Sequence, residues 1–327
     1  MKKLRICSAI ANVNWEHDNL LKGLKDAGHE VSNYDWILNG FNQYSPDWES
    51  KGKAAMNETL ASFVESLTRV SGKFDVFFGY VSEPVILPDT LCRIKKCCDV
   101  MINYSCNNIA SFGRTHSGIQ EYFDYNFHAE KEAGRKFDTN KTVPVYFPFG
   151  VNRDSAAWFS EVIAKASHPW DLIGASFVGQ LYGYRLEWIT SLTRFGMPIN
   201  IASKVSYDRM KAINLSSKIS LGFRGLGNSA FEDFNMKQIR LRDFETLALG
   251  GFYLTEYHPE LEEHYEIGKH IETFSSYQEF RDKALFFSSA NQDRKRNIML
   301  VEGHKLVVNE YTWVKRFDKA FKEIGLI

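Results

Sequence analysis

One short segment of the chain combines two arginines and a glutamate with a double glycine. Arg240, Arg242 and Glu245 stand at the start of a predicted helix that ends at Gly250 and Gly251. Arginines beside the N–H groups of a helix N-terminus suit a diphosphate, and a carboxylate there can accept hydrogen bonds from a pair of sugar hydroxyls. A surface helix with an ordinary Arg–Glu salt bridge has the same spacing. The residues alone leave both interpretations open.

A second group of polar side chains follows the first predicted strand. Glu16, His17 and Asp18 come soon after the apolar run 4–11. If that run is a strand of a parallel sheet, they lie at the carboxyl edge, where such sheets bind ligands. Each is a candidate general base that takes the proton of a bound hydroxyl group. Asp18 is equally suited to be the N-cap of the helix predicted over 19–28, and both interpretations stay open.

Several common catalytic motifs are missing from the chain. The glycines at 174 and 179 are followed by Gln180 in place of the lysine of a phosphate-binding P-loop. No two aspartates are separated by a single residue, which removes the D-x-D metal clamp of one large class of sugar transferases. His258, His264 and His270 are spaced by six residues and share no helical face. The sequence therefore predicts no metal site.

Other isolated histidines and cysteines have simple interpretations. Cys106 and His116 resemble a nucleophile and its base, but no third group is available to orient them. His128 is interpreted as an ordinary strand-end histidine. The five cysteines fit neither a disulfide framework nor paired zinc-ligand spacing. We expect reduced thiols, and with them a cytoplasmic protein.

The overall composition excludes some classes of protein. The chain has 40 Lys and Arg residues and 40 Asp and Glu residues, so its formal net charge is zero. This balance removes the broad positive field of proteins that bind nucleic acid mainly through phosphates. No apolar run approaches the ~20 residues of a membrane-spanning helix, and the N-terminus has no secretory signal. We expect a globular protein with packed cores.

Two series of strands must position the candidate residues. Strands alternating with helices predict parallel sheets of the βαβ type. The first series has apolar runs at 4–10, 30–34, 75–80, 100–104, 125–128 and 143–147, with helices at 19–28 and 57–70. The second has runs at 172–178, 199–202, 219–223 and 252–255, with helices at 185–195, 207–214 and 241–249 and two more at the C-terminus.

The 327 residues predict about two domains, at roughly 150 residues per domain. The first domain is predicted over 1–152, ending in the turn P-F-G-V-N, and a helical connector over 153–170. The second domain is predicted over 171–310, with a C-terminal helix at 311–327. Ligands of such sheets bind at the carboxyl ends of the strands, so the cleft between the domains is the expected site.

Longer strings in the second half resemble a known family. R-D-F-E-T-L-A-L-G-G-F-Y-L-T at 242–255, continued to 270, is similar to the C-terminal half of CgeB/YkvP-type glycosyltransferases, a branch of the group 1 GT-B enzymes. F-V-G-Q-L-Y-G-Y-R at 177–185 and S-K-I-S-L at 217–221 are further points of resemblance, as is N-E-Y-T-W at 309–313. The resemblance implies a GT-B fold of two Rossmann-like domains facing across a cleft, with the C-terminal helix returning to the first domain.

The resemblance also implies roles for individual residues. Glu245 would hold the ribose of the nucleotide, while Arg242, Arg185 and Lys218 would face the diphosphate and neutralise the leaving group. Such electrostatic catalysis requires no metal and no cofactor other than the nucleotide-sugar substrate.

The glycines have two possible uses. Gly250 and Gly251 would allow either close packing of helix and strand or close approach to the donor, and Gly179 likewise.

One departure from the family pattern concerns the mechanism. Retaining members often carry a glutamate eight residues before the ribose-binding one, and this chain has Lys237 there. Glu232 replaces it only if the loop is rebuilt. The stereochemical outcome and the donor sugar therefore remain open.

The predicted function is transfer of a sugar from a nucleotide diphosphate donor to an acceptor on the first domain. UDP is expected from its prevalence, with GDP as the alternative, and the acceptor is a glycan, a protein or a modified nucleic acid. Three other functions stay open: an epimerase or hydrolase of nucleotide sugars, a DNA-base-modifying glycosyltransferase, and a non-catalytic nucleotide-sugar-binding relative.

Overall fold

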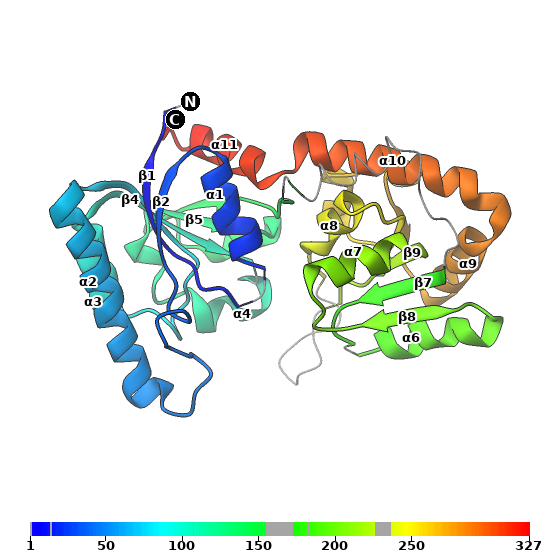
Figure 1. Ribbon diagram of the computed structural model, residues 1–327, viewed down its shortest axis with the longest axis horizontal. Helices are drawn as coiled ribbons and strands as arrows, with labels where there is room; N and C mark the ends of the chain where they lie inside the picture. The colour runs from blue at the N-terminus through cyan, green and yellow to red at the C-terminus, as the bar shows by residue number, and fades with distance from the viewer. Residues whose placement is uncertain are drawn as a thin grey trace. The chain divides into compact units, whose positions relative to one another are not determined.

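The chain forms two compact units, which Figure 1 shows in a computed structural model. The structure describes residues 2–13, 15–106, 108–152, 154, 173–181, 183–225 and 237–327. Unit 1 comprises Met1–Pro148 and Trp313–Ile327, and unit 2 comprises Phe149–Thr312. The boundary therefore falls four residues before the predicted end of the first domain. The predicted connector helix lies outside the described residues, apart from Asp154.

Unit 1 is built on a parallel sheet of six strands in the order β2-β1-β3-β4-β5-β6. The strands are β1 (Arg5–Ala9), β2 (Glu30–Tyr34), β3 (Phe74–Gly79), β4 (Cys98–Ser105), β5 (Tyr125–His128) and β6 (Val143–Tyr146). Cys7 of β1 lies beside Phe77 of β3, which in turn lies beside Met101 of β4. These central strands are covered on both faces, which explains why they read as continuous apolar runs.

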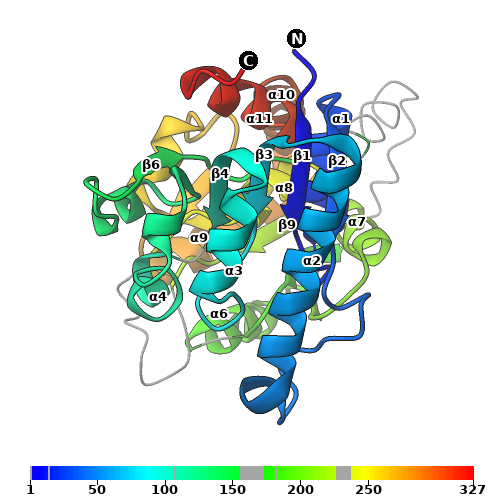
Figure 2. The same cartoon turned by 90° about the vertical axis from the view of Figure 1, so that its left-hand side faces the viewer.

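Helices cover both faces of this sheet. They are α1 (Lys22–Asp26), which continues a π-helical turn at His17–Leu21, α2 (Lys53–Ser71), α3 (Pro88–Lys95), α4 (Asn108–Thr115) and α11 (Trp313–Glu323). Helices α2 and α3 pack side by side on one face (Figure 2). Helices α1 and α11 pack against each other, and Phe317 of α11 meets Phe78 at 5.5 Å and Phe147 at 5.1 Å between ring centroids. The prediction that the C-terminal helix returns to the first domain is confirmed.

Unit 2 has a parallel sheet of five strands in the order β11-β10-β9-β7-β8. The strands are β7 (Ile173–Val178), β8 (Ile199–Ala202), β9 (Ser217–Gly222), β10 (Tyr253–Glu256) and β11 (Glu272–Phe274). The helices are α6 (Arg185–Ser191), α7 (Tyr207–Leu215), α8 (Arg242–Ala248), α9 (Tyr277–Ser288) and α10 (Asp293–Glu310). With α11, three helices follow the last strand where the sequence predicted two, because the turn at Ala290–Gln292 divides α9 from α10.

The two faces of the unit 2 sheet have separate cores. Neighbouring strand residues point to opposite faces, and Phe177 packs with the side chains of α6 and α9, whereas Val178 packs with Met210 of α7 and with Leu249 beyond α8. Helices α6 and α8 therefore begin on opposite faces of one sheet edge. Of the helices that the structure describes, none has the length and apolar character needed to cross a bilayer.

The double glycine fixes how α8 ends and how closely the next segment packs. Gly250 has a φ of +78°, in the left-handed region typical of the residue after a helix. A Cβ on Gly251 would lie 2.7 Å from Cγ2 of Thr246 and 2.8 Å from Oγ of Ser220. Both contacts are closer than real Cβ atoms come, so close packing of helix and strand accounts for Gly251, whereas the left-handed backbone accounts for Gly250.

We expect Gly251→Ala to lower the free energy of unfolding by about 1–3 kcal/mol, because the added methyl overpacks this junction. Urea unfolding measures the change. The control is Gly113→Ala in α4, where a Cβ would meet nothing within 4 Å. It should be neutral or stabilise the protein by up to about 1 kcal/mol. Equal losses in the two variants would contradict the interpretation.

Candidate functional site

A buried ion pair holds the start of α8 at the carboxyl edge of the unit 2 sheet. Arg224, which follows β9, is fully buried and donates from Nη1 to Oδ2 of Asp243 at 2.5 Å. Its Nε donates to the Glu256 carbonyl at 2.7 Å. The Asp243 carboxylate also accepts from the Arg240 backbone N–H at 2.5 Å and from the Tyr253 hydroxyl at 2.7 Å. The first turn of α8 is thereby tied to both β9 and β10.

Glu245 is a buried carboxylate with few partners. Its side chain is 6% exposed, and no described residue donates a hydrogen bond to it. Burial raises the pKa of Glu245 to about 7, against the opposing charge of Arg242. An ionised carboxylate is costly to bury without donors, so this group suits a ligand that brings its own hydroxyls.

The neighbouring arginines remain partly accessible. Arg240 and Arg242 are both half-buried, and Nη1 of Arg242 lies 3.9 Å from the sulfur of Met210 in α7. The charge of Arg242 acts on Glu245. The structure thus brings Arg240, Arg242 and Glu245 together at one edge of the sheet, as the sequence predicted.

Arg185 has a different use from the one predicted. Its Nη1 donates to the Gln180 carbonyl at 2.9 Å and its Nη2 to the Gly225 carbonyl at 2.6 Å. It therefore ties the loop after β7, which begins at Gly179, to the loop after β9. Since α6 and α8 begin on opposite faces of the sheet, the structure does not bring Arg185 and Arg242 together. Arg185 is a positioning residue for these two loops.

Lys218 lies at the wrong end of its strand for the role predicted for it. It is the second residue of β9, at the amino edge of the sheet, and Nζ donates to the Ser288 carbonyl at 2.9 Å. A lysine near a helix C-terminus interacts favourably with the free carbonyl groups there, and Ser288 is the last residue of α9. The prediction that Lys218 faces a diphosphate with Arg242 is wrong.

Glu256 is a site residue that the sequence analysis did not single out. Its Oε2 accepts from the backbone N–H groups of Arg224 at 2.9 Å and Gly225 at 3.2 Å and from the Tyr184 hydroxyl at 2.8 Å. Lys237 pairs with Oε1 at 3.2 Å. Burial alone would raise the pKa of Glu256, but these donors outweigh it and lower the pKa. Its position directly at the end of a strand was the available signal.

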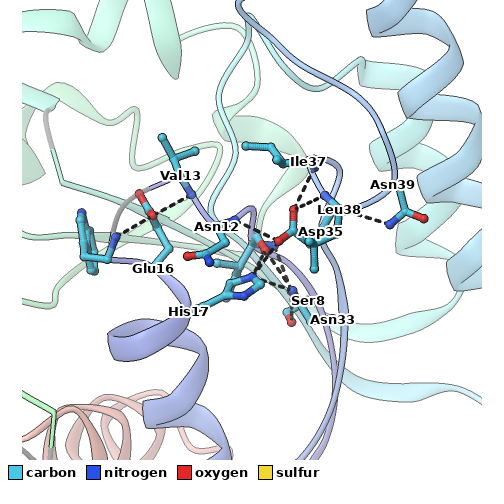
Figure 3. Close-up of polar contacts among 12 residues, drawn as sticks. Ser8, Asn12, Val13, Glu16, His17, Asn33, Asp35, Ile37, Leu38 and Asn39 are labelled. Carbon is cyan, nitrogen blue, oxygen red and sulfur yellow. Dashed lines mark hydrogen bonds and ion pairs between the residues drawn. The ribbon is translucent and has the colours of Figure 1, made fainter. Parts of the chain in front are cut away.

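In unit 1, His17 anchors the loop that follows β1. Its Nε2 lies 3.0 Å from the Ile10 carbonyl and 3.1 Å from Oδ2 of buried Asp35, which follows β2 (Figure 3). Oδ1 of Asp35 accepts from the backbone N–H groups of Ile37 at 2.8 Å and Leu38 at 3.2 Å. This nitrogen of His17 therefore holds the loop in place.

Glu16 and Asp18 take separate positions. Glu16 is buried, and its Oε2 accepts from the backbone N–H groups of Val13 at 3.1 Å and Trp15 at 3.0 Å. Asp18 is exposed and lies inside the π-helical turn, which begins at His17, so the N-cap interpretation of Asp18 is wrong. Of the three candidates, Glu16 lines a cavity of about 380 Å³ in unit 1.

Cys106 and His116 line the same cavity but do not form a nucleophile and base pair. Nδ1 of His116 lies 2.6 Å from Oγ1 of Thr115, and burial lowers the pKa of His116 to about 4. The sulfur of Cys106 lies 3.0 Å from the Tyr80 hydroxyl. His128 is buried with Nδ1 2.9 Å from the Glu130 carbonyl, as an ordinary strand-end histidine. The described residues contain no cluster of three His, Cys, Asp or Glu side chains arranged to hold a metal.

Comparisons with known proteins identify the architecture. A family model described as glycosyl transferase-like matches residues 157–322, whereas none of the curated proteins matches the chain by sequence. Anabaena HepE, crystallised with UDP and glucose, has a TM-score of 0.61 at 8% identity, over 99% of this chain and 100% of that one.

Two further solved structures agree with this result. A glycosyltransferase from Rickettsia africae ESF-5 has a TM-score of 0.60 at 11% identity, covering 99% of this chain and 98% of that one. Sucrose-phosphate synthase from Thermosynechococcus elongatus has a TM-score of 0.61 at 9% identity, covering 98% and 99%. The predicted fold, two Rossmann-like domains of the GT-B type with parallel sheets, is confirmed.

The raised pKa of Glu245 predicts how the stability of the protein changes with pH. An acid whose pKa is about 7 when folded and near 4.5 when unfolded destabilises the folded state progressively as pH rises between these values. Glu245→Gln should therefore raise the Tm by several degrees above pH 7 and have little effect below pH 4.5. Thermal unfolding across this range tests it.

The control variant is Glu256→Gln, for which the opposite sign is expected. The lowered pKa of Glu256 means that its ionised form stabilises the fold, so this variant should lower the Tm at neutral pH. A Glu245→Gln protein that is less stable than the wild type at pH 8 would rule out the assignment.

Proposed function

The chain belongs to the glycosyl transferase-like family, and from that premise we propose that it transfers a sugar from UDP, held by unit 2, to an acceptor bound by unit 1. The observation that carries the proposal is Glu245, a buried carboxylate without a described donor beside the cation of Arg242. A nucleotide diphosphate brings what both groups need: ribose hydroxyls for the carboxylate and negative charge for the arginine.

In the proposed donor site, Glu245 accepts hydrogen bonds from the ribose hydroxyls. Arg242, with Arg240 beside it, faces the diphosphate and stabilises the charge that develops on the leaving group as the glycosidic bond breaks. Arg242 lies in the first turn of α8, which the Arg224–Asp243 pair holds in place. The proposed transfer therefore needs no metal ion.

UDP is preferred to GDP because HepE, which shares the fold, was crystallised with UDP-glucose. We place the chain in the CgeB/YkvP-type branch on the strings at 177–185 and 242–255. The acceptor is a glycan, a protein or a modified nucleic acid. Consumption of the donor without an acceptor would instead indicate an epimerase or hydrolase, and binding without any turnover a non-catalytic relative.

We expect Glu245→Ala to weaken UDP binding about tenfold or more, since a hydrogen bond to a charged group contributes about 1.5–3 kcal/mol. Arg242→Ala should lower kcat clearly while changing the Tm only slightly. Calorimetry with UDP and GDP, and donor turnover, measure these effects.

The matched control is Lys218→Ala, which removes a cation at the amino edge of the same sheet and should leave UDP affinity unchanged. If Glu245→Ala and Arg242→Ala keep full affinity and full rate, the donor site lies elsewhere.

Removal of metal ions tests the source of the positive charge. With arginines stabilising the leaving group, donor turnover should be the same in excess EDTA as in millimolar Mg²⁺. A loss of turnover in EDTA that added Mg²⁺ restores would show that a metal ion performs this role.

A further inference from the structure

A cavity in unit 2 lies between the turn before β11 and the start of α10. Residues that precede a strand of a parallel sheet lie at its amino edge, and Lys218 reaches the end of α9 at that same edge. The proposed donor site lies at the carboxyl edge, so this cavity is separate from it. Its volume is about 410 Å³, and it is lined by Gly268, Lys269, Asn291, Arg294, Lys295, Ile298 and Met299.

The charged residues of this cavity are all cations. Lys269, Arg294 and Lys295 line it, and its described lining contains no Asp or Glu. Nζ of Lys269 lies 2.8 Å from Oε2 of Glu266, which offsets that charge. Asp293, next to Arg294 in sequence, pairs with a different arginine of α10. Within the described part of the chain, Arg294 and Lys295 therefore have no acidic partner, and an anion would be attracted to both.

Aromatic rings hold Lys295 in place. Its Nζ lies 5.2 Å from the ring centroid of Phe287 and 5.9 Å from that of Phe286. Such cation–π contacts are attractive, but a ring has no net charge and does not neutralise the ammonium group. An anion that enters the cavity therefore meets a cation that is already positioned.

Two large apolar side chains flank these cations and face solvent. Phe286 is 50% exposed and Ile298 is 54% exposed. Ile298 lines the cavity about one helical turn after Lys295, and Phe286 is one of the two rings against Lys295. A small hydrophilic anion would leave both apolar side chains in water, where they gain nothing from its binding. The surface of a bilayer with anionic lipids offers phosphates for the cations and, just beneath them, apolar chains for Phe286 and Ile298.

We propose that this surface, which comprises Lys269, Phe286, Arg294, Lys295 and Ile298, docks unit 2 onto a bilayer that contains anionic lipids. A headgroup phosphate enters the cavity and pairs with Arg294 and Lys295, while Phe286 and Ile298 enter the interfacial layer of the bilayer. This role goes beyond the proposed function. It requires neither UDP nor turnover, because the surface lies at the opposite edge of the sheet from the proposed donor site.

The charge argument is tested by flotation of the full chain with vesicles of phosphatidylcholine, alone or mixed with phosphatidylglycerol. We expect binding to the mixed vesicles only, weakening as salt is added because salt screens the attraction. Arg294→Gln combined with Lys295→Gln should weaken this binding about tenfold or more. The matched control is Arg135→Gln combined with Lys136→Gln, an exposed pair of unit 1 whose removal changes the net charge equally. It should bind as the wild type does.

Two results would overturn the proposal at this stage. The first is a wild type that does not float with the mixed vesicles. The second is an equal loss of binding in the two double variants, which would show that only the net charge of the chain matters. Circular dichroism of each variant confirms that its fold is unchanged.

The apolar residues distinguish a bilayer from a soluble anion. Ile298→Gln should weaken vesicle binding several-fold, because it removes apolar surface that enters the bilayer. Val70→Gln, at an 85% exposed position on α2 of unit 1, should leave it unchanged. Calorimetry with glycerol phosphate supplies the headgroup chemistry without the bilayer and should detect only weak binding. Full vesicle binding by Ile298→Gln, with tight binding of glycerol phosphate, would identify the ligand as a soluble anion and overturn the membrane assignment.

Discussion

The ion pair between Arg224 and Asp243 is the interaction on which the unit 2 site depends. Both side chains are essentially excluded from solvent, and removal of one partner from such a pair typically costs about 3–5 kcal/mol because the other charge is left unpaired. The pair joins β9, β10 and the first turn of α8, which carries Arg242 and leads to Glu245. The same pair therefore holds in place the turn that carries both Arg242 and Glu245.

The local pattern of the chain was enough to predict most of the strands and the longer helices, but not α3, α4 or β11. Tyr125–His128 and Ile199–Ala202 were predicted to the residue, because short apolar runs between polar turns have few alternatives in a parallel sheet. Glu245 and Arg242 were predicted as neighbours because one short helix carries both. Helix starts were harder to predict, and the helix at His17 begins two residues before the predicted one. The Glu16 side chain accepts a hydrogen bond from Val13 in the preceding loop, so this helix has no side-chain cap to mark its start.

The direction of a long side chain depends on contacts that are distant in the chain. Lys218 reaches the end of α9, 70 residues away, and Arg185 reaches Gly225, 40 residues away. No rule of sequence spacing predicts partners this distant. Arg185, Arg242 and Lys218 were therefore predicted as one group, whereas the fold separates them. The same holds for Tyr104, whose hydroxyl has no hydrogen-bond partner among the described residues because of what surrounds it in three dimensions.

Local charge, more than net charge, distinguishes the two candidate sites. The chain as a whole carries no net charge. The edge of the unit 2 sheet nevertheless presents Arg240 and Arg242, whereas the lining of the unit 1 cavity presents Glu16 and neutral hydroxyls. Coulomb interactions are strong at a few ångströms and screened beyond about 10 Å, so the charges that matter to a ligand are those of the few residues around it. A negatively charged ligand is therefore favoured beside Arg240 and Arg242 and disfavoured beside Glu16.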